Sequence, residues 1–508
     1  MPIRVLPSSD PQRSWPLHGV KSTREIESAI AKQVVGIDLM QRAGLAVARC
    51  TLALAPHADR IWIACGSGNN GGDGLEAALH LKQWGKDVWL TWLGEPDSCP
   101  SDALAAYKRV QAEGLHIQQE APATFDFCVD ALLGIGQVAL QQNASQRHIG
   151  RNERMSQWIA IMNAGQAPVL AVDLPTGLNG DNGQTSPNCV RAQFTLSLLT
   201  LKPGQFTATG RDVCGEIWLD DLLVSWPNTG MALVAPGTTV TARLGGLPSL
   251  AKRRHASHKG SYGDVGIMGG AKGMVGAAIL AGRAAARAGA GRTFVSLVDE
   301  TPLAVDPDFP ELMLRTVDKL DQRLMSVVIG CGGGAAVALH MARALDEAKW
   351  LVIDADGLNA ISADPTLQQG LKRRSQELRH TVLTPHPLEA ARLLETTAAE
   401  VQQDRLQHAQ RLAEQFGCVV VLKGSGSVIA GPGMVPVINP TGNAKLATAG
   451  TGDVLAGMLG AALGALGKSA TLEDVQATSA AVVHQHGEVA DRWPSGQGFT
   501  ASDLIRNL

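Results

Sequence analysis

Short apolar runs recur along the chain, and segments with the apolar spacing of helices lie between them. The runs, each a predicted strand, lie within residues 61–65, 126–130, 169–172, 264–268, 294–298, 326–329, 350–353, 381–383 and 418–422. After the first run, the segment from Gly74 to Trp84 carries apolar residues at helical spacing. Strands that alternate with helices predict α/β domains built on mainly parallel sheets.

The periodic pattern fades between Ser225 and Leu250, where proline and glycine residues gather. The chain has 508 residues. At roughly 100 to 200 residues per domain, that length suffices for two domains with separate cores. We therefore predict a boundary near residue 230, with one domain at 1–230 and the other at 231–508.

Composition narrows the class of partner. The chain is 45% hydrophobic and 18% charged, and 44 basic against 47 acidic residues give a net charge of -3. This balance provides no broad cationic surface for nucleic acid or membrane, so a small-molecule substrate is favoured.

The sequence shows neither an apolar leader nor a long apolar run, which predicts a cytoplasmic protein. The eight cysteines form no CxxC pair, and we expect reduced, packed thiols.

Glycines and aspartates follow the predicted strands of the first domain. The stretch Gly66–Gly74 precedes a helix, so its backbone N–H groups can approach a phosphate, and its first glycines match the G-x-G-x-x-G spacing of a dinucleotide fold. Asp130 and Asp173 each follow a strand. In a parallel sheet they should converge with the glycine loop on one crevice. Alone, each aspartate is equally explained as a helix cap.

Three loops of the second domain carry candidate chemistry. Ala449–Asp453 leads into a helix whose N-terminus can face an anion, and Asp453 can take a proton from an acceptor hydroxyl. Asp453 could instead simply cap that helix. Lys423–Ser427 is a second glycine loop, able to contact a nucleotide, and His386 is held between two prolines, where a structural role is equally open. Three such loops fit one cleft better than three unrelated turns.

The first domain resembles the NAD(P)H-hydrate epimerase family at Asn69–Leu75, Val129–Gly134 and Val172–Gly177. The resemblance implies that the hydrated nicotinamide nucleotide contacts Asn69, Asn70, Gly71, Gly72, Asp73, Gly134, Ile135, Gly136, Gln137, Val138, Ala139, Leu140 and Asp173. It further implies a potassium ion held by Asn70, Asp130 and Thr176, whose oxygens suit a hard cation. Asp173 is the candidate catalytic acid/base. Thr176 stands where serine is usual but keeps the hydroxyl.

The second domain resembles the ribokinase-like fold and, within it, the ADP-dependent NAD(P)H-hydrate dehydratases. The matching segments are His258–Gly260, Gly269–Gly270, Gly276–Ala278, Pro310–Met313, Asp354–Asp356, Thr384–Pro387, Leu422–Gly424 and Ala449–Asp453. The resemblance implies that the hydrate contacts Ala277, Gly334, His386 and Asp453, the last being catalytic. It implies that ADP, with Mg²⁺, contacts Lys423, Gly424, Ser425, Gly426, Ser427 and Gly452. Cys331 departs from the family pattern, in which proline is common.

Together the resemblances imply a Rossmann-like three-layer α/β domain followed by a ribokinase-like α/β domain, in a homo-oligomer. The first would interconvert the R and S epimers of hydrated NADH and NADPH. The second would phosphorylate the S epimer with ADP and release AMP and phosphate, restoring NAD(P)H. An alternative is an ATP-dependent ribokinase-like kinase with a regulatory nucleotide-binding front domain. Another is a front domain that only binds or scaffolds.

Overall fold

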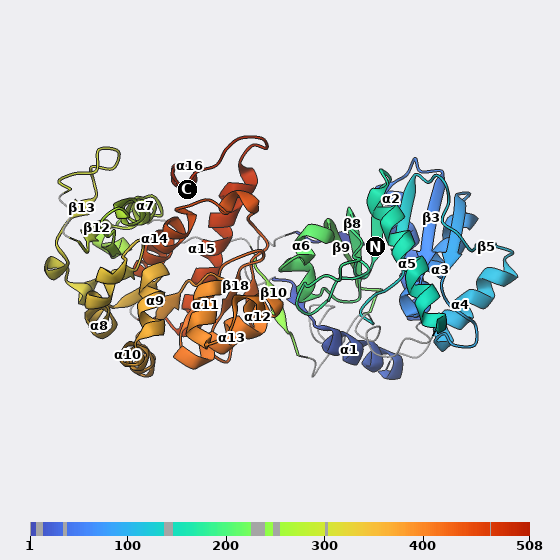
Figure 1. The fold of residues 1–508 in the computed structure, drawn as a ribbon, viewed down its shortest axis with the longest axis horizontal. Coiled ribbons are helices and arrows are strands. Elements are labelled where there is room, and N and C mark those ends of the chain that lie inside the picture. Colours follow the sequence, from blue (N-terminus) through green and yellow to red (C-terminus); the bar gives the residue numbers. More distant parts are fainter. Residues whose placement is uncertain are drawn as a thin grey trace. The chain divides into compact units, whose positions relative to one another are not determined.

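The computed structural model describes residues 2–6, 14–33, 38–136, 146–224, 239–246, 255–299, 303–467 and 469–508. They form two compact units (Figure 1). The front unit comprises Met1–Leu6 and Pro16–Ala242, and the back unit comprises Pro7–Trp15 and Arg243–Leu508. The boundary predicted near residue 230 lies outside the described residues.

The front unit is built on one sheet in the order β1-β9-β8-β7-β6-β3-β4-β5, in which only the β1–β9 pair is antiparallel. The strands of this sheet are β1 (Ile3–Arg4), β3 (Arg60–Cys65), β4 (Asp87–Trp92), β5 (Ile117–Gln118), β6 (Phe127–Ala131), β7 (Val169–Val172), β8 (Phe194–Leu198) and β9 (Glu216–Asp220). The short strand β2 (Pro16–Leu17) is not part of it. Its helices are α1 (Val20–Gln33), α2 (Leu39–Leu54), α3 (Asn69–Gln83), α4 (Ser101–Ala112), α5 (Gln146–Ala164), the 3₁₀ helix η3 (Pro203–Phe206) and α6 (Gly210–Val213).

Strand β3 shows how three layers arise. Alternate side chains of a strand point to opposite faces, so Ile61 and Ile63 join one core while Trp62 and Ala64 join another. The first core is closed by α2, α3 and α4 and the second by α5. The predicted Rossmann-like three-layer arrangement is confirmed.

The sheet of the back unit runs β13-β12-β11-β14-β15-β16-β17-β18-β19-β10. Neighbouring strands are parallel except around β18, which is antiparallel to both of its neighbours. The strands are β10 (Ala242–Leu244), β11 (Asp264–Gly269), β12 (Arg292–Leu297), β13 (Met313–Leu314), β14 (Ser326–Ile329), β15 (Trp350–Ile353), β16 (Thr381–Leu383), β17 (Val419–Leu422), β18 (Val428–Ala430) and β19 (Val437–Ile438).

Helices cover this sheet. The α-helices are α7 (Val275–Arg287), α8 (Ala338–Glu347), α9 (Ala355–Ala363), α10 (Pro365–Gln376), α11 (Pro387–Leu394), α12 (Ala398–Gln403), α13 (Arg405–Phe416), α14 (Thr451–Gly464), α15 (Leu472–Arg492) and α16 (Ala501–Arg506). The 3₁₀ helices are η4 (Lys259–Tyr262), η5 (Val317–Lys319), η6 (Gln322–Leu324), η7 (Ala335–Val337) and η8 (Ala444–Leu446).

Two glycines bring α14 close to its neighbours. A Cβ at Gly457 would lie 2.1 Å from the carbonyl oxygen of Ala281 in α7, and one at Gly460 would lie 2.4 Å from Val328 in β14. No side chain fits at either position without a shift, because interiors are close-packed. These two glycines therefore allow α14 to pack closely against α7 and β14, and this packing positions the N-terminus of α14.

One sequence prediction needs correction. The glycine stretch 66–74 was expected to be a loop leading to a helix from Gly74, but α3 already begins at Asn69 with Gly68 as its N-cap. Asn69 and Asn70 therefore lie in the first helical turn. Helix propensity disfavours glycine, and here packing overrides it, because Gly71, Gly72 and Gly74 are buried.

Candidate functional sites

The carboxyl ends of β6, β3 and β7 lie side by side in the front unit. Cys65 is paired with Ala131 across β3 and β6, and Asp130 with Ala171 across β6 and β7. The glycine loop turns tightly there, since a Cβ on Gly66 would lie 1.8 Å from the carbonyl oxygen of Leu132. The predicted convergence of strand ends and glycine loop is present in the structure.

Asp130 and Thr176 form a buried polar pair. The hydroxyl of Thr176 donates to Asp130 Oδ1 at 2.7 Å, and its backbone N–H donates to Oδ2 at 2.8 Å. The backbone N–H of Leu133 donates to the Thr176 hydroxyl at 3.0 Å. Desolvation raises the pKa of Asp130 to about 6, against the lowering effect of these hydrogen bonds. The carboxyl group of Asp130 is therefore buried away from water, and no cationic side chain among the described residues contacts it.

Asn70, in the first turn of α3, lies close to the segment that follows β6. A Cβ on Gly134 would lie 2.9 Å from Asn70 Oδ1, so the amide is close to the loop that follows β6. Asn70 Nδ2 is buried and has no hydrogen-bond partner among the described residues. Such an atom is costly unless a ligand satisfies it. Gly134, Ile135 and Gly136 are described, whereas Gln137, Val138, Ala139 and Leu140 lie outside the described residues.

Asp173 follows β7 in a left-handed backbone conformation, with φ of 66°. Its carboxylate forms an ion pair with the ammonium group of Lys202, which is fully buried. Lys202 Nζ also donates to the carbonyl oxygens of Leu198 at 3.1 Å and Thr200 at 2.8 Å. The sequence analysis missed Lys202. Its only signal was a lysine placed directly between an apolar run and Pro203-Gly204.

Two more carboxyl groups lie near Asp173. Burial raises the pKa of Asp73 well above its usual range, and the negative charge of Asp173 raises it further. Burial also raises the pKa of Glu27, with Asp173 again adding to the shift. Asp73 and Glu27 therefore hold their protons more tightly than free carboxyl groups do, and the charge of Asp173 contributes to both shifts.

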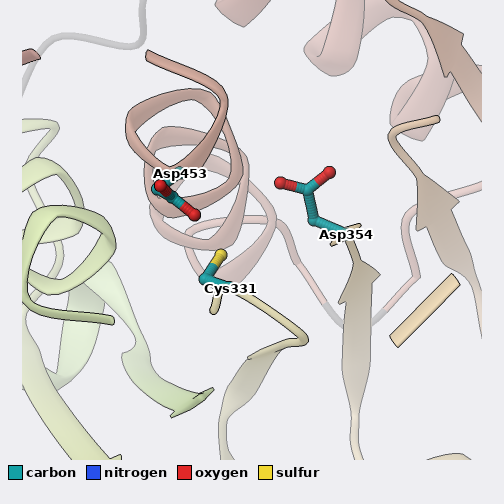
Figure 2. A group of neighbouring side chains, drawn as sticks. All are labelled: Cys331, Asp354 and Asp453. Carbon is teal, nitrogen blue, oxygen red and sulfur yellow. The ribbon is translucent and has the colours of Figure 1, made fainter. Parts of the chain in front are cut away.

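In the back unit Asp453 lies in the first turn of α14, whose N-cap is Gly450 with φ of 90°. The alternative that Asp453 merely caps the helix is therefore wrong. Figure 2 shows Asp453 beside Cys331, which follows β14, and Asp354, which follows β15. One ligand atom from each of the three residues lies within 4.8 Å of the other two.

Lys423 brings the second glycine loop to this cluster. Its ammonium group contacts Asp354 Oδ1 at 2.7 Å, and the Thr384 hydroxyl donates to the same oxygen at 2.8 Å. A Cβ on Gly452 would lie 3.6 Å from Lys423 Nζ. The three loops predicted to share a cleft do meet here. Asp354, to which the sequence analysis gave no role, joins them.

The electrostatics of the cluster favour a proton acceptor. Desolvation raises the pKa of Asp453 to about 6, the charge of Asp354 adds to the shift, and a hydrogen bond from the Cys331 thiol opposes it. Burial lowers the pKa of Lys423, but the negative charges of Asp354 and Glu389 raise it by more. The pKa of Lys423 is therefore raised overall. A carboxyl group with a pKa near neutrality suits general-base catalysis.

The remaining predicted residues lie around this cluster. His386 caps α11, because its Nδ1 accepts hydrogen bonds from the backbone N–H groups of Leu388 and Glu389. This histidine therefore has a structural role, and its contact with the hydrate stays a prediction. The backbone N–H of Gly334 donates to Asp356 Oδ2 at 2.8 Å. A Cβ on Gly332 would lie 2.8 Å from that of Ala277.

The glycine loop after β17 is held by its own contacts. Gly424 has φ of 140°, and a side chain there would strike the Arg405 guanidinium. The Ser427 hydroxyl donates to the carbonyl oxygen of Gly424 at 3.2 Å. Ser425 and Gly426 complete the turn between β17 and β18.

No helix among the described residues is both long and apolar enough to cross a membrane.

The fold and the two clusters of strand-end carboxylates define a two-domain α/β enzyme that acts on nucleotides. Residues 265–508 match the family model described as NAD(P)H-hydrate dehydratase, and residues 36–204 match the YjeF-related protein N-terminus. Bifunctional NAD(P)H-hydrate repair enzymes are similar over nearly the whole chain. That of Escherichia coli is 35% identical, with 99% of this chain and 94% of the relative covered. That of Coxiella burnetii is 34% identical, with 97% and 98% covered.

The chain belongs to the bifunctional NAD(P)H-hydrate repair enzymes. A solved ADP/ATP-dependent NAD(P)H-hydrate dehydratase from Bacillus subtilis, co-crystallised with ATP and Mg²⁺, is 30% identical. The match covers 51% of this chain and 93% of that one, with a TM-score of 0.41.

Proposed function

We propose that the front domain, assigned to residues 1–230, interconverts R- and S-NAD(P)HX, and that the back domain, assigned to 231–508, dehydrates the S epimer with ADP. The observation that carries this proposal is the presence of one acid/base aspartate in each unit, Asp173 with Lys202 and Asp453 with Asp354. Small-molecule nucleotides are the substrates, as in the relatives. A cytoplasmic location and a homo-oligomer remain predictions.

In the front domain, Asp173 acts as the acid/base that exchanges the hydroxyl at the hydrated carbon. Lys202 compensates its charge without leaving a proton free for the substrate, because all three N–H groups of the ammonium have partners. The first turn of α3, Asn69–Asp73, binds the nucleotide phosphate with its backbone N–H groups. The unpartnered Nδ2 of Asn70 is available to donate a hydrogen bond to the substrate.

The residues Asn70, Asp130 and Thr176 fit a potassium ion. They offer an amide, a carboxylate and a hydroxyl oxygen, a donor set that suits hard cations. The carboxylate of Asp130 has no cationic partner among the described residues, and desolvation by burial raises its pKa. Bound there, potassium would neutralise this charge and anchor the loop that begins at Gly134.

In the back domain, Asp453 takes the proton from the hydrate hydroxyl, whose oxygen attacks the β-phosphorus of ADP while AMP leaves. The phosphate ester then departs with its C–O electrons, and loss of a neighbouring C–H proton restores the dihydronicotinamide. Backbone N–H groups at the start of α14 face the developing negative charge, a contribution of about 3 kcal/mol per well-aimed donor. Lys423 to Ser427 and Gly452 bind the nucleotide, and Ala277, Gly334 and His386 bind the hydrate.

Mg²⁺ is proposed to arrive with ADP, and no side chain is assigned to it. The triangle of Cys331, Asp354 and Asp453 does not suit it as a cage, because a thiol is a poor ligand for Mg²⁺. In addition, Asp354 Oδ1 is already bonded to Lys423 and Thr384.

The test incubates purified protein with a mixed-epimer hydrate of NADH and with ADP or ATP, and follows the recovery of dihydronicotinamide absorbance. Fast and full recovery with ADP supports both activities. Recovery that stops once the S epimer is consumed refutes the epimerase and leaves a front domain that only binds. A stable phosphorylated product formed with ATP, without recovery, supports the kinase alternative.

A further inference from the structure

A cavity of about 920 Å³ lies beside β4 and β5 of the front unit, and none of the candidate site residues described above lines it. Its walls come from the segment after β4, from α4 and from the first half of α5. None of the residues that line the cavity forms one of the hydrogen bonds or ion pairs of Asp130 and Asp173 described above. A polar cavity of this size is large enough for a nucleoside with its phosphate.

The cavity lies at the end of β4, one strand away from the glycine loop. Cys65 at the end of β3 is paired with Trp92 at the end of β4, and the N–H of Leu93 donates to the Cys65 carbonyl oxygen at 2.9 Å. On the other side, Cys65 is paired with Ala131 of β6. Neighbouring strands lie about 5 Å apart, so the cavity begins roughly 10 Å from the end of β6, with the glycine loop in between.

The lining combines stacked aromatic rings with cations. Trp92 and Tyr107 stack with ring centroids 4.5 Å apart and planes at 28°. Arg151 and Arg154 lie three residues apart on α5 and therefore share a face. Glu95 is the one carboxylate among the lining residues, and Arg154 Nη1 donates to Gln119 Oε1 at 3.2 Å. Aromatic rings bind the flat face of a nucleobase, and the arginine fork matches phosphate oxygens.

We propose that this cavity binds the adenosine half of the hydrated dinucleotide, with Arg151 and Arg154 contacting the 2′-phosphate of NADPHX. The glycine loop then holds the pyrophosphate, and the nicotinamide end reaches Asp173. In doubly wound sheets a dinucleotide lies across the strand ends in this order, with its pyrophosphate at the helix N-terminus. The assignment rests on the proposed epimerase function and extends it to substrate specificity.

The test compares full-length R151Q/R154Q, Tyr107→Leu and the control Arg49→Gln, an exposed arginine that does not line the cavity. The substrates are R-NADPHX, R-NADHX and the hydrate of nicotinamide mononucleotide, which lacks adenosine. We expect the double variant to raise KM for NADPHX about tenfold or more and KM for NADHX at most about threefold. Tyr107→Leu should raise both KM values. Neither variant should change turnover of the mononucleotide hydrate or dehydration of S-NADHX.

The outcomes are distinguishable. Wild-type protein that does not epimerise NADHX or NADPHX refutes the proposed epimerase, and this proposal with it. Active wild-type protein whose KM values are unchanged in both variants refutes the cavity assignment alone. A variant that slows the mononucleotide hydrate as strongly as the dinucleotides also refutes it, because the side chain then acts on the reacting end or on folding.

Discussion

Replacing Lys202 with methionine tests how Asp173 is held in the front site. The ammonium group of Lys202 is fully buried and bonds to Asp173 and to two backbone carbonyl oxygens. Methionine fills a similar volume but leaves all three acceptors without that donor. Removing one partner of a buried ion pair costs about 3 to 5 kcal/mol, because the remaining charge is left uncompensated.

That free energy should appear as local opening of the strands that carry the pair. In hydrogen-exchange mass spectrometry we expect the amides of β7 and β8 to exchange roughly 150- to 5,000-fold faster, since exchange reports the free energy of opening. Epimerase activity should fall at least about a hundredfold, while dehydration of the S epimer by the back domain stays within about twofold.

The matched control is Lys86→Met, because Lys86 also donates to two carbonyl oxygens, of Pro56 and Ala58, but has no carboxylate partner within the described part of the chain. The double variant Lys202→Met/Asp173→Asn should recover much of the lost protection, since it removes the stranded charge. If Lys202→Met keeps full epimerase activity and unchanged exchange, the ion pair is not what holds Asp173, and the reasoning is refuted.

Three further predictions concern single side chains. Cys331→Ala removes a hydrogen bond that lowers the pKa of Asp453, and the raised pKa of about 6 already includes this lowering. The acidic limb of the dehydratase pH profile should therefore move to higher pH, whereas Cys331→Ser should keep it nearer its original place. Asp354→Asn removes a negative charge that raises the pKa of Asp453, so the acidic limb should move to lower pH. The same variant should raise KM for ADP, because Lys423 loses its carboxylate partner. Asp130→Asn should abolish stimulation of epimerase activity by KCl, and Thr176→Ser should retain it.

Local pattern predicted most of the fold. The strands predicted at 326–329, 350–353 and 381–383 coincide with β14, β15 and β16, because a buried parallel strand is a short apolar run closed by turn residues. The start of α3 was missed because glycines that look like a loop are buried in helix packing. Lys202 and Cys331 were missed as partners of the two aspartates. Lys202 meets Asp173 only when β7 pairs with β8, and Cys331 meets Asp453 only when α14 packs against β14.

The two aspartates differ in where the nearest lysine is placed. In the front unit the lysine contacts the candidate acid/base itself, Asp173. In the back unit the lysine contacts Asp354 instead, while Asp453 faces that same carboxylate and a thiol. A cation in contact with a carboxylate favours its charged form, whereas a neighbouring anion favours its protonated form. Lys423 can therefore face the nucleotide without neutralising Asp453. This keeps Asp453 near the protonation midpoint at which a carboxyl group both accepts and returns a proton.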